Sequence, residues 1–256
     1  MSDSKPEQRR PRRGIYLLPN LITTLALFFG FYAVVSAQGG AYELAAIAIF
    51  IAMLADGLDG RVARLTNTQS DFGVQYDSIA DMISFGIAPA LVVYLWALQD
   101  LAELGTVLGK LGWLAAFIYT ACAALRLARF NTQASTASRR HFQGLPSPAA
   151  AATLAGLVWA GDRLEFGGWP AGIPALIITT LAGILMVSNI RYESFKEIDF
   201  RYRVPFVVMV LGVLAVALMS VHPPSVLLGL ALLYMGSGPI LTVVRRRERR
   251  KRRQAG

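Results

Sequence analysis

The sequence predicts an all-α integral membrane protein of about eight transmembrane helices. Of its 256 residues, 55% are hydrophobic and 16% are charged, which is more apolar than an ordinary soluble domain. The apolar residues gather in runs that are long enough for a helix to cross a bilayer. These runs cover residues 16–37, 41–62, 77–98, 109–129, 146–161, 169–190, 203–221 and 224–243.

Several of these runs carry local signals of their own. Pro19 stands in the first run, near its start, where a helix tolerates proline well. The second and third runs are the polar ones, because they carry four aspartates. The fourth run ends in a basic segment, and the sixth leads into another. The fifth run is short and rich in alanine, and Pro146 and Pro148 at its start need no role beyond beginning a helix.

Lysine and arginine are distributed very unevenly over the loops. With the N-terminus placed in the cytoplasm, all but two of the 25 basic residues fall on the cytoplasmic side. Only Lys110 and Arg163 fall on the other side. This positive-inside bias predicts that both termini are cytoplasmic, which requires an even number of spans.

The chain is expected to form one membrane-embedded domain, residues 15–244, between basic tails at 1–14 and 245–256. We expect no cleaved signal peptide, because the first apolar run is long enough to span and lacks an evident cleavage site. The basic tails have two interpretations, attraction to anionic membrane lipids and binding of nucleic acid. No aromatic residue interleaves the C-terminal basic run, so we favour lipid headgroups, at about 1 kcal/mol per basic residue.

Four carboxylates lie close together in the second and third runs, at Asp56, Asp59, Asp77 and Asp81. An ionised side chain in the bilayer core costs about 2.5–3.5 kcal/mol on insertion scales, so the group needs a neutralising partner. The spacings i,i+3 and i,i+4 place each pair on one helix face, and two such faces make an all-oxygen cage. Mg²⁺ or Mn²⁺ prefers such ligands. The alternative is that the acids only cap helices at the membrane edge.

Two glycines and an arginine accompany the acids. Gly60 and Gly73 remove side chains where a nucleotide would approach the backbone closely. Arg64 is placed to meet a phosphate.

The whole motif resembles the signature of the CDP-alcohol phosphotransferases, without a gap or a substitution. It reads Asp56-x-x-Asp59-Gly60-x-x-Ala63-Arg64-x8-Gly73-x3-Asp77-x3-Asp81. The resemblance implies a cytoplasm-facing active site in which the four aspartates bind divalent ions, two in number, with Asp81 also acting as general base. It implies that Asn20 and Thr23 line the nucleotide site. It further implies a homodimer and, for a bacterial source, the cytoplasmic (inner) membrane.

Further segments are similar to the integral-membrane phosphatidylserine synthases within that family. They are Thr68–Ser78, Arg126–Asn131, Phe142–Ala150 and Ser188–Lys196. The similarity implies that the substrates are CDP-diacylglycerol and L-serine and that the products are phosphatidylserine and CMP. Neither histidine lies in a His-x-Lys context, so we expect direct in-line attack by the serine hydroxyl and no phosphoryl-enzyme.

A serine substrate needs a partner for its carboxylate. Charge and topology make Arg126, Arg129 and Arg191 the candidates, with Asn131 in support. Arg126 and Arg129 also have a purely structural interpretation, since basic residues at a helix C-terminus complement the helix dipole.

Two other functions remain open at this level. One is a different transferase of the same family, such as a phosphatidylglycerophosphate or phosphatidylinositol-phosphate synthase, because the same arginines would suit an acceptor that carries a phosphate. The other is an ion-coupled multi-pass transporter. The acids lie at a cytoplasmic end and the chain has no repeated half, and both features count against a transporter.

Overall fold

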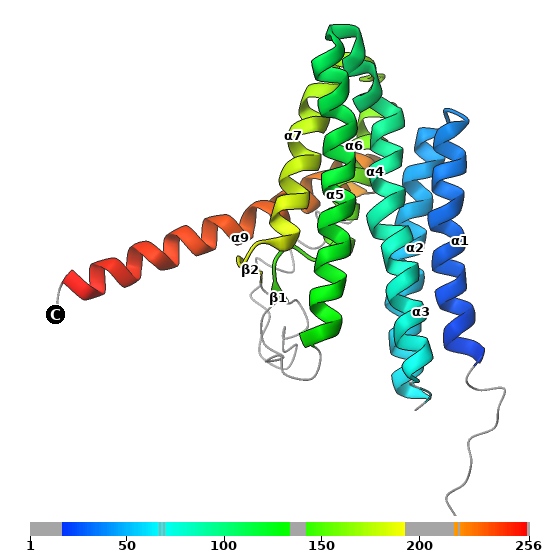
Figure 1. The fold of residues 1–256 in the computed structure, drawn as a ribbon, viewed down its shortest axis with the longest axis vertical. Helices are drawn as coiled ribbons and strands as arrows, with labels where there is room; N and C mark the ends of the chain where they lie inside the picture. The colour runs from blue at the N-terminus through cyan, green and yellow to red at the C-terminus, as the bar shows by residue number, and fades with distance from the viewer. Residues whose placement is uncertain are drawn as a thin grey trace, which may run out of the picture.

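The structure is a computed structural model, and it describes residues 17–66, 68, 70–133, 142–192, 218–219 and 221–254. In this part of the chain, long helices form a bundle and two-residue strands form one antiparallel pair (Figure 1). The helices are α1 (Leu17–Gln38), α2 (Tyr42–Leu65), α3 (Asp71–Asp81), α4 (Ala88–Val93), α5 (Thr106–Gln133), α6 (Ser147–Arg163), α7 (Gly168–Val187) and α9 (Pro223–Gln254). The strands are β1 (Phe142–Gln143) and β2 (Arg191–Tyr192).

Within the described residues, five helical stretches are long and apolar enough to cross a membrane, so the chain is a multi-pass membrane protein. They are Leu18–Gln38, Asp71–Leu104, Thr106–Thr132, Gly168–Val187 and Pro223–Thr242. The predicted number of eight spans is not confirmed. Helix α2 carries several charged residues and α6 has only 17 residues. Most of the predicted run 203–221 and the N-terminal tail 1–14 lie outside the described residues. The count of eight therefore stays a prediction.

The third predicted run starts too late. The sequence placed its start at residue 77, but the helix begins at Asp71 and continues without a break to Leu104. Ser70 caps it, since the Ser70 hydroxyl accepts a hydrogen bond from the backbone N–H of Gly73 at 3.0 Å. Asp71 lies in the first turn, where a carboxylate is favoured by the helix dipole. Asp77 therefore lies one and a half turns inside the helix.

The helix widens directly after Asp81. Residues Met82–Ile87 and Tyr94–Leu98 form π-helical turns, and Gln99–Leu104 form a 3₁₀ segment. Pro89 has no N–H to donate to the carbonyl of Phe85 four residues earlier. The hydroxyl of Tyr119, a fully buried residue of α5, donates to that carbonyl at 2.9 Å. Widened turns of this kind often accompany functional sites.

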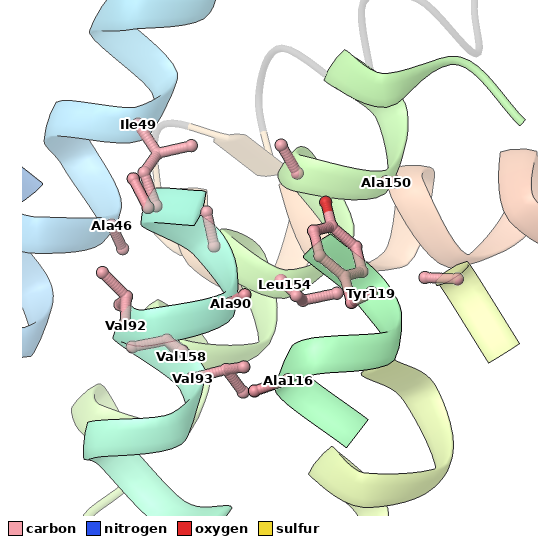
Figure 2. Packing of buried hydrophobic residues seen from close by; sticks show 14 of the residues in the cluster. Ala46, Ile49, Ala90, Val92, Val93, Ala116, Tyr119, Ala150, Leu154 and Val158 are labelled. Carbon is pink, nitrogen blue, oxygen red and sulfur yellow. The ribbon is translucent and has the colours of Figure 1, made fainter. Parts of the chain in front are cut away.

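The core of the bundle is made largely of alanine. Figure 2 shows Val92 and Val93 of α4 among side chains of α2, α5 and α6, with Tyr119 beside Leu154. The alanine-rich helix α6 is among the most buried elements. Small residues let helices approach closely, and dense packing is the main source of helix association in a membrane.

The segments singled out in the sequence meet at one end of the bundle. The start of α1, the start of α3, the end of α5 and the β1–β2 pair all lie there (Figure 1). The opposite end is held by a separate ion pair, in which Arg163 donates to Glu43 at 2.7 Å. The segments predicted to take part in binding and catalysis therefore lie at one end of the bundle, and the Glu43–Arg163 ion pair lies at the other.

Candidate functional site

Three of the four aspartates form a compact cluster between α2 and α3. One carboxylate oxygen from each of Asp56, Asp59 and Asp77 lies within 4.8 Å of the others. Asp81 is placed against Asp56, close enough for their carboxyl groups to share a hydrogen bond. The two helix faces expected from the i,i+3 and i,i+4 spacings do face each other.

The cluster fits a hard divalent cation. Its donors are all carboxylate oxygens, and Asp59 is buried. Three like charges at this separation repel strongly wherever water is partly excluded, so an opposite charge stabilises the arrangement. Oxygen-only donor sets of this kind suit Mg²⁺ or Mn²⁺.

Thr23 of α1 makes its main contact with the cluster. Its hydroxyl lies 2.7 Å from Oδ2 of Asp59 and 3.1 Å from the carbonyl oxygen of Pro19. The residue is buried. The sequence suggested Thr23 as a nucleotide contact, whereas in the structure its hydroxyl orients a carboxylate of the cluster.

Helix α1 also meets the start of α3. The Thr24 hydroxyl lies 2.9 Å from the hydroxyl of Tyr76. The amide oxygen Oδ1 of Asn20 is 3.5 Å from the position that a Cβ at Gly73 would take. Asn20 and Gly73, both expected at the nucleotide, are thus neighbours on one side of the acids.

Gly60 and Arg64 lie on the last turns of α2. A Cβ at Gly60 would meet no described atom within 4 Å, so the space beside its backbone is open. Arg64 is exposed, and its Nε donates to the carbonyl oxygen of Gly60 at 2.9 Å. Its guanidinium is therefore held beside that open space.

Arg126 is the buried cation of the site. Its Nη1 donates to the hydroxyl of Ser147 at 2.8 Å, and its Nε is buried without a hydrogen-bond partner among the described residues. The guanidinium interacts electrostatically with Asp81, so it lies on the side of the acids. Ser147 is the first residue of α6 and lies in the segment Phe142–Ala150, for which the sequence left a structural role and a functional role open.

Gly144 shapes the approach to Ser147. Its φ is +80°, and a Cβ at this position would collide with the carbonyl oxygen of Met186 in α7. Only glycine lets the chain pass there before it turns into α6.

Arg129 and Asn131 bind neighbouring loops and helices. The Nη2 of Arg129 donates to Oε1 of Gln143 in β1 and, at 3.0 Å, to Oδ1 of Asn189. The Nδ2 of Asn131 donates to the hydroxyl of Ser78 in α3 at 3.0 Å. The sequence reasoning named both residues but missed these three partners.

Arg191, the last candidate for the serine carboxylate, lies in β2. Its backbone pairs with that of Gln143 in β1. Its side chain lies outside the described residues. The resemblance of the segments Thr68–Ser78, Phe142–Ala150 and Ser188–Lys196 was the only signal that pointed to the missed partners of Arg126, Arg129 and Asn131.

Known proteins resemble the chain over most of its length. The sequence model of the CDP-alcohol phosphatidyltransferase family matches residues 16–218. A CDP-diacylglycerol–serine O-phosphatidyltransferase of Helicobacter pylori is 35% identical over 224 residues, which cover 88% of this chain and 91% of the relative. One from Methanocaldococcus jannaschii is 33% identical over 190 residues, or 74% of this chain and 80% of the relative. An archaetidylserine synthase of Methanothermobacter thermautotrophicus is 34% identical over 177 residues, 68% and 69% of the two chains.

Proposed function

The chain belongs to the CDP-alcohol phosphatidyltransferase family, and from that premise we propose that it transfers the phosphatidyl group of CDP-diacylglycerol to L-serine. The products are phosphatidylserine and CMP. The observation that carries the proposal is the joint placement of the Asp56–Asp59–Asp77 cluster and the Arg126 guanidinium at one end of the bundle. The names of the relatives support serine as the acceptor.

The reaction is a direct displacement at phosphorus. The serine hydroxyl oxygen forms a bond to the lipid-side phosphorus, and the bond from that phosphorus to the CMP oxygen breaks. Asp81 accepts the hydroxyl proton, a general-base role worth roughly 10²–10⁴-fold in rate. CMP leaves with the bonding electrons, and no phosphoryl-enzyme forms.

The four aspartates Asp56, Asp59, Asp77 and Asp81 would hold two divalent ions, Mg²⁺ or Mn²⁺. When bound, such ions neutralise the pyrophosphate oxygens and the departing CMP. The Thr23 hydroxyl would support metal binding, because it restrains the Asp59 carboxylate.

The nucleotide would lie on the α1 side of the acids. The open space at Gly60 and the small residue Gly73 leave room for it, and Asn20 and Arg64 border the same region. Thr23 lies beside the same region, where its hydroxyl contacts the Asp59 carboxylate.

Serine would bind on the α5 side. Arg126 lies near Asp81 and has an unused Nε, so it is our first choice for the serine carboxylate. Arg129, Arg191 and Asn131 are the further candidates for binding serine. This places the carboxylate of serine on the arginines and its hydroxyl toward Asp81.

The proposal also includes the membrane, the orientation and the oligomeric state of the protein. We place residues 15–244 in the cytoplasmic (inner) membrane with both termini in the cytoplasm, as a homodimer. The tails 1–14 and 245–256 then face anionic membrane lipids, and no nucleic acid is needed. The positive-inside bias supports this orientation.

CMP release by the purified full-length protein in detergent tests the function. CDP-diacylglycerol and Mn²⁺ or Mg²⁺ are supplied with L-serine, glycerol-3-phosphate or inositol phosphate. We expect serine-dependent release that a chelator abolishes. Release only with a phosphorylated acceptor would overturn the serine assignment and favour a phosphatidylglycerophosphate or phosphatidylinositol-phosphate synthase. Exchange of labelled CMP into CDP-diacylglycerol without serine would overturn direct attack.

A further inference from the structure

Helix α9 lies beyond the residues that the family model matches, yet it packs against α6 and β2. The family model ends at residue 218, and α9 begins at Pro223. Its first half contacts α6 and β2, while its second half extends away from the bundle (Figure 1).

One aromatic side chain of β2, Tyr192, makes specific contacts with α9. The hydroxyl of Tyr192 donates to the carbonyl oxygen of Met235 at 2.9 Å, and its ring lies 5.6 Å from that of Tyr234. Tyr192 is fully buried. A Cβ at Gly238 would lie 2.6 Å and 2.8 Å from the ring carbons Cε1 and Cε2 of Tyr192, so glycine is required there.

From β2 the contact continues to Arg129. The backbone of Arg191, the residue before Tyr192, pairs with that of Gln143 in β1. Gln143 of this pair and Asn189, two residues before Arg191, both accept hydrogen bonds from Arg129. A shift of Tyr192 therefore moves both acceptors of the Arg129 guanidinium.

We propose that α9, through Tyr192, positions Arg129 and thereby sets the affinity for the acceptor substrate. Tyr192 is a positioning residue that acts through Arg129. The inference rests on the proposed function, since the affinity in question is that for serine.

The substitution Gly238→Ala tests the inference, because it pushes on the Tyr192 ring and removes no functional group. Gly236→Ala is the matched control, since a Cβ at Gly236 meets no described atom within 4 Å. Both changes replace a glycine by alanine in the same helix, so they share the gain in helix propensity. CMP release is measured against serine at saturating CDP-diacylglycerol, and against CDP-diacylglycerol at saturating serine.

We expect Gly238→Ala to raise the serine KM about tenfold or more, the scale of one lost charge-assisted hydrogen bond, with the KM for CDP-diacylglycerol within about twofold of wild type. Gly236→Ala should match wild type in both. Equal behaviour of the two variants would overturn the inference. So would an equal rise of both KM values, or a fall in kcat alone, because α9 would then support the bundle as a whole.

Tyr192→Phe keeps the inference testable if Gly238→Ala does not fold. It removes only the hydrogen bond to Met235, and a smaller rise confined to the serine KM is expected; an unchanged serine KM would count against the inference. Wild-type protein is assayed first. Absence of serine-dependent release from wild type contradicts the proposed function, whereas a difference in outcome among the variants concerns only α9.

Discussion

Replacing Thr23 by valine removes one hydroxyl group beside the acidic cluster and keeps the shape of the side chain. That hydroxyl lies 2.7 Å from Oδ2 of the buried Asp59. Hydrogen bonds to charged groups contribute about 1.5–3 kcal/mol. Loss of a partner that orients a metal ligand typically weakens metal binding by about 10–100-fold, or about 1.4–2.8 kcal/mol at 1.4 kcal/mol per tenfold. The two estimates agree, so we expect the half-saturating Mn²⁺ concentration to rise about 10–100-fold.

The assay is CMP release at fixed CDP-diacylglycerol and serine over a range of free Mn²⁺. Activity of Thr23→Val should return at saturating metal. Thr24→Val is the control, because the Thr24 hydroxyl contacts the carbonyl oxygen of Asn20 and the hydroxyl of Tyr76 instead of a carboxylate. Wild-type metal dependence combined with a raised KM for CDP-diacylglycerol would refute the reasoning. Thr23 would then contact the nucleotide directly.

Four further outcomes are expected. Asp81→Asn should retain CDP-diacylglycerol binding in a direct binding assay but lose turnover by roughly 10²–10⁴-fold; CMP release at the wild-type rate would exclude Asp81 as the base. Arg126→Ala should raise the serine KM about 10–100-fold and change the KM for CDP-diacylglycerol far less; an unchanged serine KM would remove Arg126 from the serine site. Tyr119→Phe should lower the free energy of unfolding by about 1–3 kcal/mol, because the Phe85 carbonyl loses the hydrogen bond from the Tyr119 hydroxyl, and an unchanged unfolding midpoint would contradict this. Neutralising the basic residues of 245–253 should weaken the dependence of activity on anionic lipid in vesicles; an unaltered dependence would exclude that tail as the lipid contact.

The acidic cluster was predictable because its geometry is mostly local. Asp56 and Asp59 share a helix face through their spacing alone, as do Asp77 and Asp81. Only one tertiary fact was needed, that the two faces meet, and the cost of burying unpaired carboxylates already favoured it. The structure brings three of the four together and leaves Asp81 against Asp56.

The start of the third helix was not predicted, because no apolar run marks it. The first turn of that helix is polar, and its start is set by the Ser70 cap and the dipole preference of Asp71. These are short-range hydrogen-bond effects that a hydropathy pattern does not contain. Hydropathy also leaves the number of spans open, because α2 carries the charged residues of the site and α6 is short.

The sequence pattern could not predict the partners of Arg126 and Arg129. Arg126 meets Ser147 across 21 residues of sequence, and Arg129 meets Asn189 across 60. Neither spacing follows a helical period, so these contacts exist only once α5, α6 and the β1–β2 pair are packed together. The role we propose for Tyr192 and Gly238 depends on a side-chain contact between β2 and α9 and has the same origin.

By itself, the sequence determined that this is a helical membrane protein with a CDP-alcohol phosphotransferase motif and carboxylates paired on helix faces. Hydrophobicity, helical periodicity and covalent spacing act over short stretches of chain, so they can be read from the sequence alone. The tertiary structure alone decided which groups orient those carboxylates and arginines. Hydrogen bonds such as that of Thr23 to Asp59 require side-chain atoms of two helices to lie within about 3 Å of each other. Such proximity arises from packing the whole bundle, where small residues allow the helices to come that close.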